Sequence, residues 1–271
     1  MNIVEPHIHC ICRTTDDYER MALAGIDIVV EPAFWLGEPR KHPGTFYDYF
    51  DHIANFETER ARQFNIAHYA TIAVNPREAN NRPLAEEVLR EMPKWFAHPR
   101  VLAVGETGFD DISADEEAIF RRQVEMALAH GLPVMIHTPH RDKKRGVERI
   151  LAILAEMKAP AERILVDHNN EETTGLVRDR GMWAGHTVYP TKLTPERAAA
   201  LFRQYGVERM MVNSSADWGA SDPLSVPRVV NEMRRQGFPD ADVRTLVRDN
   251  PLAFYAQSGK ISASGERGRN P

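Results

Sequence analysis

The sequence has little cysteine, no excess of basic charge and no apolar run of the roughly 18 residues that a membrane span needs. Its only cysteines, Cys10 and Cys12, would share one strand face and are expected to be reduced packing residues rather than metal ligands or a disulfide. A formal net charge of −5 argues against strong general binding of nucleic acid. With no signal peptide and no span recognisable, the sequence predicts a cytoplasmic protein without membrane contact.

Strand-like and helix-like segments alternate through nearly the whole chain. The 271 residues are 42% hydrophobic, which is enough for a large core. Eight short, apolar and often β-branched segments are expected as strands, near residues 2–8, 27–32, 67–74, 101–106, 132–137, 163–168, 182–187 and 208–213. Amphipathic spacing and capping residues predict helices at 83–97, 116–130, 144–157, 195–205 and 224–236.

Eight such units predict a single-domain (β/α)8 TIM barrel over residues 1–257. An open doubly wound sheet is the competing fold, but no glycine-rich nucleotide turn follows the first strand. Residues 258–271 are rich in Gly, Ser, Lys and Arg and are expected to form a disordered tail. The loop from Pro32 to Thr45 is long for a βα connection, and a lid and a plain surface excursion are both open readings.

Several expected strands end on a residue that binds metals or moves protons. The spacing of His7 and His9 puts both imidazoles on one strand face. In a TIM barrel the active site lies at the C-terminal ends of the strands. A lone histidine there is more often structural, but a whole set at one end indicates a metal site. The set is His7, His9, Glu106, His137, His168 and Asp217.

These pieces together resemble the TatD-like hydrolases of the amidohydrolase superfamily. The resemblance runs from residue 3 to about residue 257 and includes the segment from Val104 to Asp110 and the closing segment from Asp249 to Phe254. Glu5 stands where the family usually has Asp, and His168 is followed by two asparagines rather than the Cys-Phe-Ser of TatD nucleases. These departures affect the transfer of substrate more than the transfer of metal chemistry.

The resemblance implies two divalent ions, with zinc, manganese or iron suited to imidazole and carboxylate ligands. His7, His9 and Asp217 would hold one ion, His137 and His168 the other, and Glu106 would bridge them. A metal-bound hydroxide would then attack the substrate, and Asp217 would act as the catalytic proton acceptor. Charge counting leaves such a site slightly cationic, which favours an anionic group such as a phosphate ester.

Substrate contacts are less well specified by the sequence. Arg141 and His140 follow His137 and would either hold a substrate anion or belong to a solvated helix entry. His186, at the end of the seventh strand, and Tyr189 are further candidates. Glu5 and Asp167 would each orient a ligand imidazole, although Asp167 alternates away from His168.

The resulting hypothesis is a metal-dependent hydrolase acting on a small-molecule or short nucleotide-like ester, a phosphoesterase or nuclease-like reaction. One alternative is an amide or lactone hydrolase of the same superfamily. Another is a non-catalytic metal-binding subunit of a pathway, which the intact ligand set disfavours. The sequence leaves the substrate, the native metal and the oligomeric state open.

Overall fold

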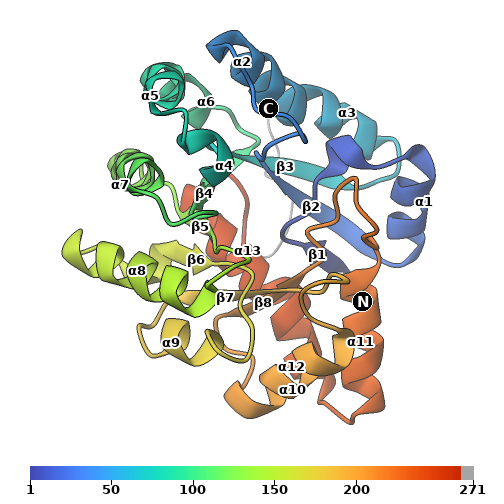
Figure 1. Cartoon of the computed structure of the whole chain (residues 1–271). Helices are drawn as coiled ribbons and strands as arrows, with labels where there is room; N and C mark the ends of the chain where they lie inside the picture. Colours follow the sequence, from blue (N-terminus) through green and yellow to red (C-terminus); the bar gives the residue numbers. More distant parts are fainter. Residues whose placement is uncertain (264–271) are drawn as a thin grey trace.

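The computed structural model describes residues 1–263 and contains a sheet of eight parallel strands in the order β1 to β8. The helices surround this sheet in chain order (Figure 1). The TIM-barrel prediction is therefore confirmed. The strands are β1 Ile3–Glu5, β2 Ile26–Pro32, β3 Ala67–Ile72, β4 Val101–Gly108, β5 Val134–His137, β6 Ile164–Val166, β7 Trp183–Thr187 and β8 Met210–Asn213.

The barrel closes just beyond the ends of β1 and β8. The Ser215 amide donates to the His7 carbonyl at 2.8 Å, and the His9 amide donates to the Ala216 carbonyl at 2.9 Å. These bonds join the segments that follow the two strands. They also fix the backbone that carries both N-terminal histidines of the expected metal site.

The helices follow the predicted pattern with shifts at their ends. The 83–97 stretch divides at Pro93, which begins a separate short helix. The α-helices are α1 Thr15–Leu23, α2 Pro43–Asp51, α3 Glu57–Arg62, α4 Pro76–Ala79, α5 Arg82–Glu91, α6 Pro93–Phe96, α7 Ala114–Ala129, α8 Lys143–Glu156, α9 Thr174–Arg178, α10 Pro195–Tyr205, α11 Ser225–Arg235, α12 Asp240–Arg244 and α13 Asn250–Tyr255. Single 3-10 or π turns lie at η1 Cys10–Cys12, η2 His52–Phe56, η3 Ala161–Arg163, η4 Thr245–Asp249 and η5 Ala256–Ser258.

Local sequence explains where the long helices begin. Ser113 caps α7 by accepting from the Glu116 amide, and the Glu116 carboxylate in turn accepts from the Ser113 amide. The same carboxylate accepts from the amides of Asp110 and Asp111, so it also fixes the loop between β4 and α7. Thr194 caps α10 in the expected way, by accepting from the Arg197 amide.

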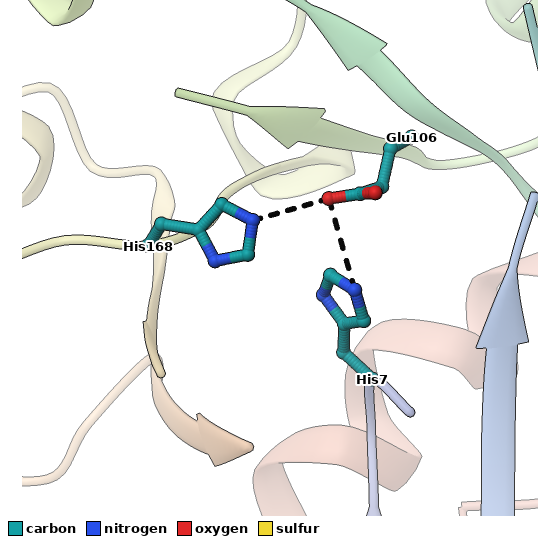
Figure 2. A group of neighbouring side chains, drawn as sticks. All are labelled: His7, Glu106 and His168. Atoms are coloured by element: carbon teal, nitrogen blue, oxygen red, sulfur yellow. Dashed lines mark hydrogen bonds and ion pairs between the residues drawn. The ribbon is translucent and has the colours of Figure 1, made fainter. Parts of the chain in front are cut away.

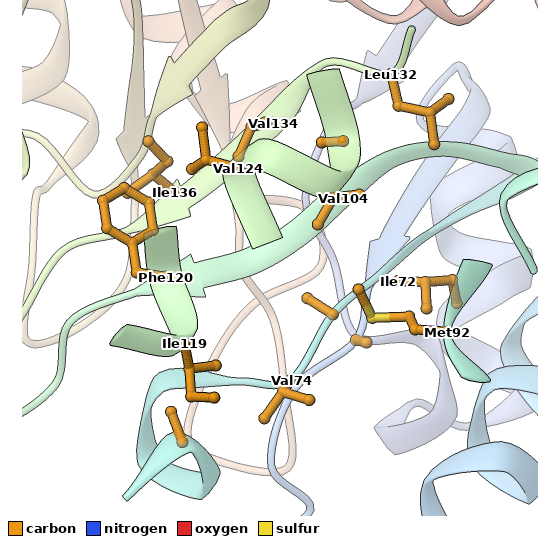
Figure 3. Packing of buried hydrophobic residues seen from close by; sticks show 14 of the residues in the cluster. Ile72, Val74, Met92, Val104, Ile119, Phe120, Val124, Leu132, Val134 and Ile136 are labelled. Carbon is orange, nitrogen blue, oxygen red and sulfur yellow. The ribbon is translucent and has the colours of Figure 1, made fainter. Parts of the chain in front are cut away.

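The core has separate layers inside the barrel and outside it. One buried cluster takes side chains from all eight strands, including Val4, Tyr69 and Met211, and adds Phe254 from α13. Strand residues of the opposite alternation pack outward against the helices. Figure 3 shows part of this outer layer, to which Val104 of β4, Val134 of β5 and Phe120 of α7 belong. The strand ends are thus held between two packed layers.

The loop after β2 lies against the expected site. Phe34 is buried, and its ring stacks on the His9 imidazole with centroids 3.6 Å apart. Arg40 holds the loop by donating to the Phe34 carbonyl and pairing with Glu78 at 2.6 Å. Phe34 and Trp35 at the start of this segment line the site cavity, while most of residues 36–45 are exposed.

The packed chain extends past residue 257, where the tail was expected to begin. Lys260 donates to the carbonyls of Phe96 and Val101, and Ile261 is buried. Disorder from residue 258 is therefore wrong for 258–263, because these contacts hold the chain against the barrel. Residues 264–271 lie outside the described residues. No helix within residues 1–263 combines the length and the apolar character required to cross a bilayer.

Candidate metal centre

Three strand ends bring their imidazoles to one oxygen of Glu106. Glu106 Oε1 lies 2.9 Å from His137 Nδ1, 3.1 Å from His168 Nε2 and 3.7 Å from His7 Nε2. Figure 2 shows His7 and His168 reaching this carboxylate from different strands. His7, Glu106 and His168 each offer one potential ligand atom within 4.8 Å of the others, and all three residues are buried.

The imidazoles also approach each other in two pairs. His7 Nε2 lies 3.2 Å from His9 Nε2, as their shared strand face predicted, although β1 itself ends at Glu5. His137 Nδ1 lies 3.1 Å from His168 Nε2. Nitrogens bound at about 2.0–2.1 Å to one ion would be separated by a similar distance. The donor set therefore fits divalent metal ions on either side of Glu106. We call His7, His9, Glu106, His137 and His168 the mouth cluster.

A hydrogen-bonded chain behind the ligands turns two nitrogen lone pairs toward the centre. Asp167 Oδ2 lies 2.6 Å from His7 Nδ1, so the carboxylate accepts a hydrogen bond from a protonated Nδ1. The other ring nitrogen, Nε2, then carries no proton and has a free lone pair. Asn213 donates its amide to both Asp167 oxygens. Its own oxygen accepts from the Thr187 hydroxyl at 2.9 Å.

The same chain sets the second imidazole. The Thr187 hydroxyl donates its one hydrogen bond to Asn213 Oδ1. Thr187 Oγ1 must therefore accept the hydrogen bond that joins it to His168 Nδ1, 2.6 Å away. His168 Nε2 is then bare and faces Glu106. Ligand imidazoles usually need such a partner to fix their tautomer.

Backbone geometry explains why Asp167 can serve His7. The sequence suggested that Asp167 points away from His168, but His168 adopts a left-handed φ of 60°. The strand alternation is broken there, so both side chains turn toward the mouth. Gly185 leaves room for the carboxylate, since a Cβ at that position would lie 2.2 Å from Asp167 Oδ1.

Glu5 holds backbone rather than an imidazole. Its Oε1 accepts from the His7 amide at 3.2 Å, and both of its oxygens accept from the Ser214 amide. Burial raises the pKa of Glu5 to about 8. Its predicted role in orienting a ligand imidazole is therefore replaced by a role in joining the segments after β1 and β8.

The electrostatics of the centre favour neutral His9 and His168 beside an ionised Glu106. Burial lowers the pKa values of His9 and His168 well below the usual range. Burial alone would raise the pKa of Glu106, but the neighbouring His7 and His137 hold it well below its usual range. These are the protonation states in which the side chains bind metal ions.

Asp217 lines the same cavity without joining the tight group. It lies in the loop after β8, and its Oδ1 accepts from the Gly219 amide at 2.8 Å and from the Tyr189 hydroxyl at 3.1 Å. Burial, followed by the nearby Asp217 charge, raises the pKa of Tyr189 to about 12, so the hydroxyl stays a donor. The cavity has a volume of about 160 Å³ and is also lined by His9, Glu106, His137, His168, Phe34, Trp35 and Lys192.

The candidate substrate contacts are placed differently from one another. His140 lines this cavity, and its ring stacks against that of His168 at 6.2 Å. Arg141 points to solvent, with its side chain 83% exposed and paired with Asp111. His186 of β7 is buried on the helix side of the sheet. Its Nε2 lies 3.0 Å from Thr174 Oγ1 of α9, and its Nδ1 lies 3.2 Å from the Met211 carbonyl of β8. The structure therefore does not bring Arg141 or His186 to the cavity.

Three residues of the site went unnoticed in the sequence. Thr187 and Asn213 are ordinary strand-end residues, and only the register of β7 with β8 places them together. Lys192 lies in the loop after β7, and its ammonium nitrogen is 3.2 Å from His168 Nδ1. A search for polar residues at the last position of each strand and in the loop that follows it would have included all three.

Comparison with known proteins places this geometry in a family. The family model of TatD-related DNases matches residues 7–256. An uncharacterized metal-dependent hydrolase from Methanocaldococcus jannaschii is 31% identical over 259 residues, covering 93% of this chain and 99% of the relative.

Solved structures give the same fold over nearly the full length. A TatD-like protein from Archaeoglobus fulgidus superposes with a TM-score of 0.77 at 24% identity, covering 93% of this chain and 99% of that chain. A phosphotriesterase homology protein from Escherichia coli, determined with phosphate in its active site, has a TM-score of 0.69 at 18% identity, with coverage of 94% and 98%. The chain therefore belongs to the TatD-related DNase family, as its resemblance to the TatD-like hydrolases predicted.

Proposed function

We propose that this protein is a metal-dependent hydrolase of phosphate esters that works with two divalent ions held by the mouth cluster. The observation that carries the proposal is the pair of imidazole pairs, with nitrogens 3.2 Å and 3.1 Å apart, on either side of Glu106. His7 and His9 would hold one ion, His137 and His168 the other, and Glu106 both. Divalent ions bound there would polarise the substrate and activate water.

Asp217 has the position of a proton acceptor. It lines the cavity beside His9 and Glu106, and the Tyr189 and Gly219 bonds fix its Oδ1. The carboxylate would accept the proton of the attacking water and return it to the leaving group.

The charge around the cavity favours an anionic substrate. Lys192 and Arg77 line it together with Asp110 and Asp217, beside the ions proposed above. A phosphate ester suits such a site because its oxygens accept from cations and carry charge in the transition state. The Escherichia coli neighbour with phosphate in its active site shares the fold, which is consistent with this choice.

The proposal is tested by replacing Asp217 in metal-loaded protein. Asp217→Asn should retain metal but lose hydrolysis of bis(p-nitrophenyl) phosphate by about a hundredfold or more. Asp111→Asn is the matched control, because Asp111 is an exposed carboxylate paired only with Arg141 on the outer surface. Equal rates in the two variants would remove Asp217 as the base. A wild-type protein that cleaves lactones or amides but no phosphoester would overturn the substrate class.

A further inference from the structure

A larger pocket opens beside the metal centre. It has a volume of about 920 Å³ and shares His140, His168 and Lys192 with the smaller cavity. The first turn of α8 forms one side of it, and the loop after β7 forms another. A substrate that reacts at the mouth cluster can therefore extend into this pocket.

Lys192 brings a positive charge to the junction of the two cavities. Its ammonium nitrogen lies 3.2 Å from His168 Nδ1, but that ring nitrogen directs its proton to Thr187. A protonated ring nitrogen offers no lone pair to an ammonium group. The side chain is half-buried, and its other close neighbour is the Tyr189 ring, 5.4 Å from the ammonium nitrogen. Within the part of the chain that the structure describes, no oxygen atom accepts a hydrogen bond from the Lys192 ammonium group, which faces the junction.

Lys143 supplies a second charge from the start of α8. It donates one hydrogen bond to the Thr138 hydroxyl at 2.9 Å, and among residues 1–263 its other two ammonium protons have no hydrogen-bond acceptor. Burial and then repulsion by Lys192 lower the pKa of Lys143 to about 7. Because both lysines line the same pocket, an anion bound there would favour the protonated form of each.

Three other half-buried cations each pair with a carboxylate. Arg13 pairs with Asp17 at 2.8 Å, Arg40 with Glu78 at 2.6 Å, and Arg60 with Glu57 at 3.0 Å. Across residues 1–263, by contrast, no carboxylate oxygen lies within 4.0 Å of the ammonium nitrogen of Lys143 or Lys192. Two cations without a carboxylate partner that line one pocket are costly unless a ligand compensates them.

We infer that Lys143 and Lys192 form a subsite for a second oxyanion of the substrate, separate from the ester that reacts at the metal centre. The substrate would therefore carry two anionic groups, with a phosphate ester at the mouth cluster and a phosphate or carboxylate between the lysines. Both groups accept charge-assisted hydrogen bonds from ammonium ions. The inference rests on the proposed function for the first group and adds the second.

Paired probes test the subsite by calorimetry on metal-loaded protein. Propyl phosphate carries one anionic group, while propanediol bisphosphate and carboxyethyl phosphate each carry a second. Simultaneous engagement of two sites should make at least one two-anion probe bind about tenfold more tightly than propyl phosphate. The variants are Lys143→Gln with Lys192→Gln, Glu106→Gln, and the control Lys158→Gln, an exposed lysine beyond the C-terminal end of α8.

The double lysine variant should bind all three probes equally, while Lys158→Gln should keep the wild-type preference. The double variant removes unpaired charges, so it should fold, and its metal content checks the centre. Preference for the carboxylate probe alone would assign a carboxylate, and preference for the bisphosphate alone would assign a phosphate.

An unchanged preference in the double variant, or none in the wild type, would overturn the subsite. If Glu106→Gln then abolished binding of every probe, the metal centre would still stand. The reverse result would support the lysine subsite and reject the proposed function. If Glu106→Gln left propyl phosphate binding unchanged while the lysine variant lost the preference, the proposed function would fail and the subsite would remain.

Discussion

Within residues 1–263, two groups of side chains bring potential metal-ligand atoms together, one at the mouth of the barrel and one in its wall. The wall cluster consists of Cys10, Glu31 and His68, whose potential ligand atoms also lie within 4.8 Å of one another. In the wall, His68 Nε2 is bonded to Glu31 at 2.8 Å. At the mouth, several imidazoles point their nitrogens at one another beside a cavity.

The difference lies in convergence rather than in residue type or burial. The wall cluster offers a single imidazole, already bonded to its carboxylate. Burial raises the pKa of the Cys10 thiol well above its usual range, so that no thiolate is available. The mouth cluster has four imidazoles around one carboxylate. This comparison predicts that metal binding belongs to the mouth, and the following substitutions test it.

Replacing Glu106 should have the largest effect. Glu106→Gln removes the carboxylate at the meeting point of the two imidazole pairs, so both ions should be lost or bound more weakly. Hydrolysis of bis(p-nitrophenyl) phosphate should fall about a thousandfold or more, which corresponds to roughly 4 kcal/mol in the barrier. Stopped assays at saturating metal measure this loss.

The matched control is Glu31→Gln, a buried glutamate that also contacts a histidine. Burial raises the pKa of Glu31 well above its usual range, so a neutral amide should replace it with little change. Activity should stay within about twofold of the wild type. Similar losses in both glutamate variants would remove the distinction between mouth and wall.

Asp167 should have a smaller effect, because it acts through His7 and not on the metal. Asp167→Asn keeps the shape of the side chain but loses the carboxylate that accepts hydrogen bonds from His7 Nδ1 and from the Asn213 amide. Metal affinity should fall about tenfold to a hundredfold. Competition with a chromogenic chelator measures the change, and excess metal should restore most of the activity. A variant with wild-type affinity would contradict the orienting role.

His186 should have the smallest effect on the metal centre, since it lies in the wall between β7 and α9. Burial lowers the pKa of His186 to about 4, although the Met211 carbonyl favours its protonated form. The unfolded state therefore binds more protons between about pH 6.5 and pH 4, and stability falls as pH falls through that window. The loss should reach up to about 3 kcal/mol at the lower end.

His186→Gln should flatten this pH dependence while leaving metal content unchanged. Urea unfolding at pH 7 and at pH 4.5 gives the change in the free energy of unfolding with pH, which is compared between the wild type and the variant. A variant that loses metal at neutral pH would place His186 in the centre after all.

Much of the fold could be predicted because its signals are local. Apolar β-branched runs identify strands such as β3 and β8 without knowledge of their neighbours. Capping at Ser113 and Thr194 marks helix starts in the same way. The sequence pattern predicts one helix over residues 83–97, although Pro93 divides that stretch into two helices in the structure. The end of the packed chain was placed too early, because Lys260 and Ile261 are held by residues far away in the sequence.

The site was predictable only where its signal is also local. His7 and His9 share a face because strands alternate, and that spacing can be read directly. Alternation also explains His186: Thr187 faces His168, so its neighbour must face the helices. The position of Asp167 depends on the left-handed φ of His168, and no pattern in the sequence predicts that backbone angle.

The most direct test of the central claim is the metal content of protein purified without chelators, measured by elemental mass spectrometry. The wild type, Glu106→Gln and Glu31→Gln should be compared side by side. We predict about two ions per chain in the wild type and in Glu31→Gln, and a clear loss in Glu106→Gln. Equal metal content in all three proteins would contradict the assignment of the metal centre to the mouth cluster.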